Sequence, residues 1–141
     1  MPTATSISQS ATELRNVLGR LVRRLRTENT FPLSQGMVLA RLESDGPQTT
    51  SALAAAERVR PQSMAHTVAE LQSAGYVDRR PHPLDRRQIL IELTADGLAK
   101  LHEDRRRREG WLAEAIATQL TADEQEILIR AVPLLDRLTH S

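Results

Sequence analysis

The chain has 141 residues, of which 40% are hydrophobic and 26% charged, and its formal net charge is +1. This composition is typical of one globular domain, alone or with an added dimerisation element. Aromatic residues make up only 2%, which argues against a stacking platform for single-stranded nucleic acid. The absence of cysteine excludes disulfides, thiolate metal sites and a cysteine redox switch. With so small a net charge, affinity for DNA would have to come from local clusters of basic residues.

Two features bear on where the protein works. No apolar run approaches the ~20 residues that a membrane span needs. The segment from Met1 to Ser10 is polar and lacks the apolar stretch of a secretory signal. We therefore expect a cytoplasmic protein that does not insert into a membrane.

Helical periodicity begins near Ser8 and continues to about Arg26. Arginines surround its apolar stripe, and they form either a solvated face or a surface that faces DNA. The stripe consists of Leu14, Val17, Leu18, Leu21, Val22 and Leu25. A second helix is predicted from about Ser34, a good N-cap residue, to the stop signal Asp45-Gly46-Pro47.

A short helix, a turn and a further helix follow. A threonine cap at residues 49–50 opens an alanine-rich helix, and Val59 lies in the turn after it. Pro61 suits the first turn of the next helix, where its missing N–H costs nothing. Gly75 is a natural residue for the left-handed position that ends this helix.

The pattern then changes from helical to extended. Residues 76–80 are short and extended, and residues 81–87 form a turn-rich, basic loop. Residues 88–93 are apolar and β-branched, as in a strand. Together they predict a small β-hairpin with a charged tip, in which we expect His82 to face water.

A long helix is predicted from Ala95 to about Gln119, with Thr94 as its N-cap. Its two ends are apolar and its middle is almost wholly charged, which suggests that it passes between two packing environments. We interpret the charged stretch from Glu103 to Glu109 as a solvated face.

The final predicted helix begins after a capping box. Thr121 and Glu124 have the required spacing for this motif. Pro133 should kink or interrupt the helix, because proline removes a backbone donor and clashes with the preceding turn.

This order of elements is that of a winged helix-turn-helix. The major groove of B-DNA is ~12 Å wide and admits one helix, whose first residues reach the base edges. Gln62 can pair with adenine, and Arg60 with guanine or a phosphate. The candidate DNA-contacting residues of this helix are Arg60, Gln62, Ser63, His66 and Thr67. The alternative is that they are simply exposed helix residues; for His66, phosphate contact and solvation both stay open.

The tip of the hairpin carries the second candidate group, Asp85, Arg86 and Arg87. Arginine is favoured in a narrow minor groove, where the negative potential is strongest. An acid would repel phosphate, so we interpret Asp85 as an intramolecular partner that orients an arginine or closes the hairpin.

Three separated motifs follow one another along the second half of the chain. The helix exit Leu71 to Arg79 is followed by Asp85-Arg86-Arg87 and by Leu93-Thr94-Ala95-Asp96-Gly97. They resemble the pattern of the MarR family, which has a glycine after the helix, a D-R-R or D-x-R wing tip, and an L-T-x-x-G entry to a long helix. Upstream, Leu53-Ala54 and Pro61-Gln62-Ser63-Met64 stand where the family has its helix-turn-helix. The chain resembles the family over nearly its whole length.

The resemblance implies a mainly α fold with a small β-hairpin wing, a winged helix-turn-helix with N- and C-terminal helical dimerisation arms. Family members form homodimers that place a recognition helix in the major groove and a wing in the minor groove of a pseudo-palindromic operator. Many are repressors that a small-molecule effector releases from double-stranded DNA. By position, Pro61 to Thr67 begin the recognition helix, and Asp85 and Arg87 form the matching wing pair. The arms would be residues 8–30 and 95–141, and residues 31–94 would read DNA.

Other classes of function find little support in the residues. No two of the four histidines, His66, His82, His102 and His140, have the i, i+4 spacing of a helical metal pair, so we expect no metal and no cofactor. There is no nucleophile elbow and no glycine loop for phosphate, so we expect no enzyme. The remaining alternative is a winged-helix module that binds another protein without specific DNA binding. Such a module would not need the basic wing tip.

Overall fold

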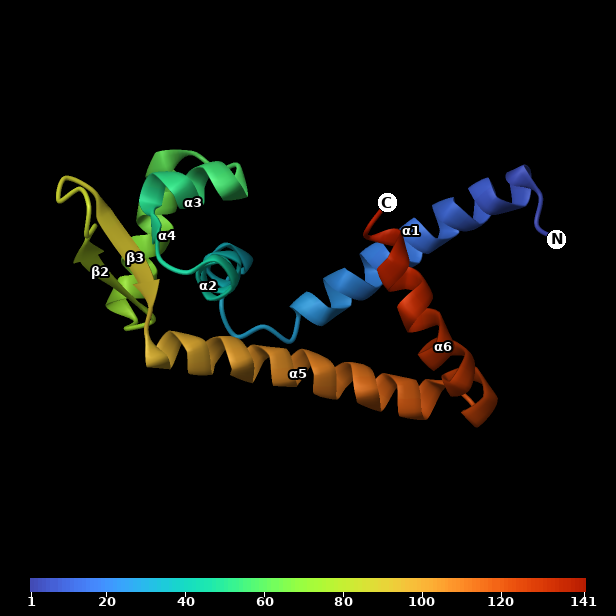
Figure 1. Ribbon diagram of the computed structural model, residues 1–141. Helices are drawn as coiled ribbons and strands as arrows, with labels where there is room; N and C mark the ends of the chain where they lie inside the picture. The colour runs from blue at the N-terminus through green and yellow to red at the C-terminus, as the bar shows by residue number, and fades with distance from the viewer. The chain divides into compact units, whose positions relative to one another are not determined.

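The computed structural model describes residues 1–141 and shows a mainly helical chain with one small sheet (Figure 1). The prediction of a mainly α fold with a β-hairpin is confirmed. The chain contains two compact units: residues 26–106, and residues 1–25 together with 107–141. None of the helices combines the length and the apolar character that crossing a membrane would require. The elements are α1 (Ala4–Arg26), α2 (Leu33–Asp45), β1 (Gln48–Thr49), α3 (Thr50–Glu57), α4 (Pro61–Ser73), β2 (Val77–Pro81), β3 (Ile89–Leu93), α5 (Ala95–Gln119) and α6 (Ala122–Leu138).

The sheet lies in the unit of residues 26–106 and is antiparallel, in the order β1-β3-β2. In the hairpin, Val77 pairs with Leu93 and Pro81 pairs with Ile89, so residues 82–88 form its tip. The third strand, β1, pairs with β3 and was not predicted from the sequence. A strand of two residues is too short to show an alternating pattern.

One hydrophobic core holds this unit together. α2, α3 and α4 each bury one apolar stripe in it, which leaves the opposite face of each helix for solvent. Leu→Ala substitutions in such a core typically cost ~2–5 kcal/mol. The buried residues are Val38, Leu39, Leu42, Leu53, Ala54, Met64, Val68, Leu71, Val77, Ile91 and Leu101.

The end of α4 has the hydrogen bonds of a Schellman motif. The N–H of Tyr76 donates to the carbonyl of Leu71 at 2.9 Å, and the N–H of Gly75 donates to the carbonyl of Gln72 at 3.0 Å. Gly75 has φ +82°, the left-handed conformation that glycine adopts at least cost. The predicted helix end is therefore confirmed, and it turns the chain directly into β2.

Thr94 connects the end of the wing to the start of α5. Its hydroxyl donates to the carbonyl of Gly75 at 2.6 Å and accepts the N–H of Gly97 at 3.0 Å. Its own N–H donates to the carbonyl of Tyr76 at 3.1 Å. The N-cap of α5 is thus also a link to the end of α4.

The charged middle of α5 is not wholly solvated, so that interpretation was wrong for Asp104. The Asp104 side chain is completely buried. It accepts the backbone N–H of Thr30 at 3.0 Å and the Thr30 hydroxyl at 2.7 Å. A buried carboxylate is tolerated where such hydrogen bonds replace water, and these bonds anchor the segment between α1 and α2.

An ion-pair cluster joins α2 to α5 on the surface of the same unit. Both Glu43 carboxylate oxygens accept from Arg105, at 2.6 and 3.1 Å, and His102 Nε2 lies 3.1 Å from one of them. The hydrogen bonds from Arg105, assisted by the one with His102, hold the pKa of Glu43 below its ordinary value. The carboxylate is therefore favoured in the folded state.

The unit of residues 1–25 and 107–141 buries no residue of α1 or α6. The capping box is confirmed: Thr121 and Glu124 exchange side-chain to backbone hydrogen bonds at 2.8 and 3.2 Å. Helix α6 continues through Pro133 without interruption. The Arg24 guanidinium lies 4.2 Å from the ring centroid of Trp111, a cation–π contact within this unit.

Gly97→Ala should destabilise the protein. A Cβ at this position would lie 2.1 Å from the carbonyl oxygen of Tyr76, so the start of α5 would have to move away from the end of α4. We expect a loss of ~1–3 kcal/mol in the free energy of unfolding, measured by urea denaturation. Gly110→Ala is the control, because nothing lies within 4 Å of its added Cβ; alanine there should stabilise the helix by ~0.5–1 kcal/mol. Equal effects of the two substitutions would contradict the close approach.

Glu43→Gln should flatten the acid limb of the stability curve. A carboxylate whose pKa is lowered by folding contributes stability above its unfolded pKa, near 4.5, and that contribution is lost as the pH falls through the folded value. Thermal unfolding from neutral pH into this range should show a steeper fall for the wild type than for Glu43→Gln. Glu126→Gln removes an exposed i, i+4 pair with Arg130 and should leave the slope unchanged. Parallel curves for all three proteins would contradict this role of Glu43.

Candidate nucleic-acid interface

Helix α4 presents its first residues to solvent because its apolar stripe is buried. Met64, Val68 and Leu71 face the core, so the intervening positions face outward. Arg60 is the N-cap residue in an extended conformation, and Pro61 occupies the first turn, as predicted. The exposed residues at this end of the helix are Arg60, Pro61, Gln62, Ser63 and His66.

Two of the predicted residues already have partners within α4. His66 Nε2 lies 3.0 Å from a carboxylate oxygen of Glu70, in an exposed i, i+4 pair. The Thr67 hydroxyl donates to the carbonyl of Ser63 at 3.1 Å, and Thr67 is half-buried. Arg60, Gln62 and Ser63 therefore offer the more accessible side-chain groups of this set.

The wing tip brings its acid and one of its arginines together. Asp85 Oδ1 accepts the backbone N–H of Arg87 at 3.1 Å and its Nε–H at 3.3 Å. The Arg87 side chain is still 92% exposed. Asp85 is thus an intramolecular partner of Arg87 that leaves most of the guanidinium in solvent, and Arg86 is exposed beside it.

His82 does not simply face water. It is half-buried, and its Nδ1 accepts the backbone N–H groups of Leu84 at 3.1 Å and of Asp85 at 3.3 Å. Sequence reasoning missed this role, although the adjacent Pro83 was a signal for a tight turn in which a side chain caps the backbone.

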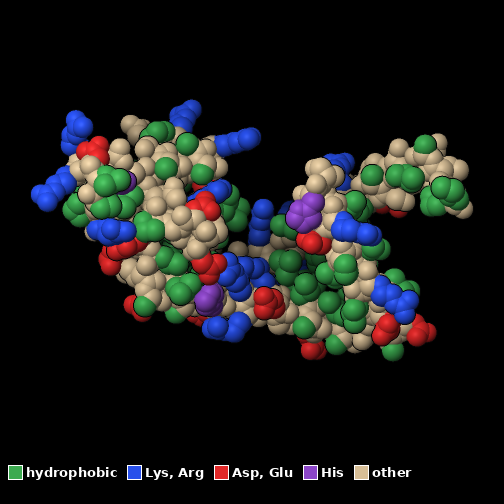
Figure 2. Space-filling model, viewed as in Figure 1, with side chains coloured by type: hydrophobic (Ala, Val, Ile, Leu, Met, Phe, Trp, Pro, Cys, Tyr) green, Lys and Arg blue, Asp and Glu red, His purple; other side chains and the backbone are tan.

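Further basic residues near these groups were also missed. Arg58 is exposed in the turn between α3 and α4, with φ 55°, and its only signal was its place in that turn. Arg79 and Arg87, with the hydroxyl residues Thr49 and Ser51, help to line a hollow of about 390 Å³ between the wing and the start of α3. Figure 2 shows Lys and Arg side chains projecting from the wing tip and from the α3–α4 end of this unit.

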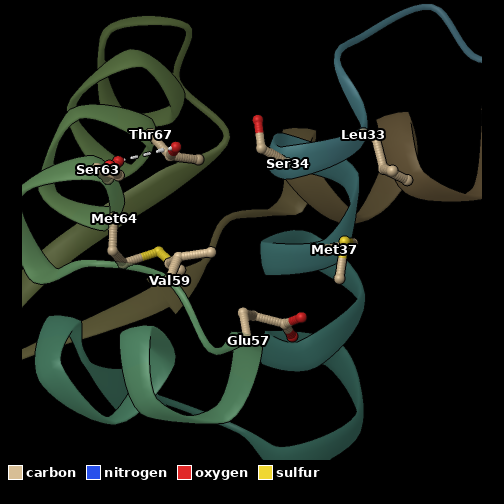
Figure 3. A pocket seen from close by; sticks show the side chains of 8 residues that line it. All are labelled: Leu33, Ser34, Met37, Glu57, Val59, Ser63, Met64 and Thr67. Carbon is tan, nitrogen blue, oxygen red and sulfur yellow. Dashed lines mark hydrogen bonds between the residues drawn. The ribbon is translucent and has the colours of Figure 1, made fainter.

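An apolar pocket of about 220 Å³ lies between α2 and the first turns of α4 (Figure 3). Leu33 and Met37 of α2 form one wall, and Val59 and Met64 form the other. Ser63 and Thr67 of α4 also line the pocket, and Glu57 and Ser34 complete the lining. A molecule in this pocket would touch the same helix turns that carry the candidate DNA contacts.

The comparisons with known proteins agree with this arrangement. The model of the MarR family matches residues 31–89. An HTH-type transcriptional regulator of Mycobacterium bovis is 41% identical over 133 residues, which is 92% of this chain and 92% of that protein. The chain belongs to the MarR family. It is therefore a transcriptional regulator and not an enzyme.

Solved structures show the MarR fold over the whole chain. A protein of Pseudomonas aeruginosa described as a transcriptional regulator has a TM-score of 0.82 and 33% identity, and each chain covers 99% of the other. A MarR family protein from Bacillus stearothermophilus has a TM-score of 0.74 at 18% identity, with full coverage of both chains. The winged helix-turn-helix prediction is confirmed by these likenesses.

Proposed function

We propose that this MarR family regulator binds double-stranded DNA, with α4 in the major groove and the wing in the minor groove. The observation that supports it is that one compact unit presents both an exposed polar helix start and a cationic hairpin tip. Gln62 and Ser63 would contact bases, Arg60, His66 and Thr67 would add base or phosphate contacts, and Pro61 would set the start of the helix. Arg86 and Arg87 would serve the minor groove, with Asp85 orienting Arg87.

Dimerisation is the second part of the proposal. Large apolar side chains remain exposed on α1 and α6, which is costly for an isolated chain. A second copy would cover them, and residues 8–30 and 95–141 would form these arms. The exposed residues include Val17, Leu18, Val22, Ile127, Ile129, Val132, Leu134 and Leu138. Two copies of the reading region, residues 31–94, would then address two half-sites of a pseudo-palindromic operator about 34–36 Å apart.

Repression that a small molecule relieves is the third part, and it rests on the family resemblance. The pocket between α2 and α4, of about 220 Å³, is smaller than the ~300–1,000 Å³ of drug-sized sites. Its size therefore suits a small apolar compound with a single ring. Occupancy that favours a displaced α4 would shift the population away from the DNA-binding form.

The test of DNA binding is a salt series. Fluorescence anisotropy with the duplex that flanks the protein's own gene, against a scrambled duplex, should show sequence-selective binding. The logarithm of the binding constant should fall linearly with the logarithm of salt, with a slope of about −0.9 for each phosphate contacted. A DNA affinity that does not change with salt concentration, or no DNA binding at all, would favour the protein-interaction function instead.

Arg87→Ala should weaken binding to every duplex by a similar factor. Loss of one phosphate or groove cation should reduce the salt slope by about 1. Arg86→Ala is the comparison variant: it removes the same charge from the neighbouring residue, which no carboxylate orients. If Arg87→Ala leaves operator affinity unchanged, the wing assignment is wrong; if Arg86→Ala has the larger effect, Arg86 enters the groove.

Gln62→Ala should relax base choice at one operator position. A glutamine that pairs with adenine contributes ~1–3 kcal/mol of discrimination there. The measurement is affinity for a set of duplexes, each with one substituted base pair. Gln119→Ala, an exposed residue at the end of α5, should not alter the profile. A uniform loss across all duplexes would make Gln62 a phosphate contact.

A further inference from the structure

The wing tip is closed by a histidine that acts as a hydrogen-bond acceptor. His82 Nδ1 accepts the N–H of Leu84, two residues on, at 3.1 Å, and the N–H of Asp85, three residues on, at 3.3 Å. Asparagine and aspartate oxygens commonly cap turns in this way. Pro83, which lies between His82 and Leu84, restricts the backbone to a turn conformation. The N–H of His82 also donates to the carbonyl of Gln88 at 3.0 Å, which closes the loop at its base.

These donors determine the chemical state of the ring. A backbone N–H can only donate, so Nδ1 must carry a lone pair and the proton must be on Nε2. In the imidazolium form both ring nitrogens are donors, and Nδ1–H would then face two N–H groups. An asparagine cap would not change in this way, whereas histidine changes charge between about pH 5 and 8.

The turn supports the DNA-facing arginine. The N–H of Asp85 is held by the ring, and Asp85 Oδ1 holds both the N–H and the Nε–H of Arg87. The side chain of Arg87 thus depends on a chain of contacts that begins at His82 Nδ1. The carbonyl of Asp85 also accepts the N–H of Gln88 at 3.0 Å, so the same turn determines where β3 begins.

The charged groups around the ring offer it no compensating ion pair. In the loop these are Asp85, Arg86 and Arg87, and the Asp85 carboxylate is turned toward Arg87. On the strands, Arg80 pairs with Glu92 at 2.8 Å and Arg79 donates to Gln72 at 2.7 Å. The other charged residue of the hairpin is Asp78, which faces Glu92 across the strands.

We propose that His82 is a positioning residue whose neutral ring holds the wing tip in its DNA-binding conformation, so that mild acidification releases the wing. The inference rests on the proposed DNA binding, because Arg87 is useful in this position only if it meets DNA. It gives the regulator a response to pH that needs no effector.

The first test needs no DNA. Amide signals of Leu84 and Asp85 in 15N–1H spectra of the full chain should shift together as the pH is lowered from 8 to 5.5, in step with the His82 ring signals. In His82→Asn, whose Oδ1 can accept the same N–H groups, they should stay in place. The proposal would be overturned if the His82 ring carries its proton on Nδ1 at pH 8. It would also be overturned if the Leu84 and Asp85 amide signals do not shift when the ring is protonated.

The second test measures operator affinity at the same pH values. At pH 8 the wild type and His82→Asn should bind within about twofold, and His82→Ala should bind about 3–10-fold more weakly, the equivalent of one or two lost hydrogen bonds. As the pH is lowered to 5.5 the wild type should lose affinity toward the level of His82→Ala, while His82→Asn keeps its affinity. His140→Gln, at an exposed residue beyond the end of α6, is the control for a general histidine effect and should retain the pH response. Equal pH responses of the wild type and His82→Asn would overturn the proposal. Absence of DNA binding by every variant would instead reject the proposed function, while the amide titration still decides the role of His82.

Discussion

The fold of the unit of residues 26–106 depends on the close approach between the end of α4 and the start of α5. At this place the Tyr76 carbonyl accepts from Thr94, the Thr94 hydroxyl bridges Gly75 and Gly97, and any side chain at residue 97 would collide with Tyr76. Helix α4, the strands β2 and β3, and helix α5 therefore start or end at one point. The direction of the wing relative to α4 follows from it.

The same unit uses carboxylates mainly to organise its own cations and donors. Asp85 orients Arg87, Glu57 accepts from Arg41 at 3.0 Å, and Glu43 accepts from Arg105. Buried Asp104 holds Thr30. A chain with a net charge of +1 can still present a locally positive wing tip, because two arginines there, Arg86 and Arg87, face a single acid, Asp85. The arginines of the turn and wing remain exposed.

The capping role of His82 depends on the protonation state of its ring. The turn needs an acceptor at this position, and several residue types could supply one. Imidazole supplies it in one protonation state alone, so the geometry of the wing becomes linked to pH through two hydrogen bonds.

The order of helices and the hairpin could be predicted from the sequence because local signals determine them. Each of these signals lies within a few residues of the chain. They are Gly75 after α4, Thr94 before α5, the capping box at Thr121 and the change of period at the wing. The family motifs and the candidate residues from Arg60 to Thr67 and from Asp85 to Arg87 follow from the same local patterns.

The tertiary structure alone decided which residues of a charged or polar stretch form hydrogen bonds or become buried. Asp104 is buried because Thr30, 74 residues away in the chain, reaches it, and β1 exists because β3 supplies its partner groups. His82 was assigned to solvent because the sequence does not show that a ring nitrogen meets two backbone donors. Such contacts depend on how distant segments meet, which local periodicity does not contain.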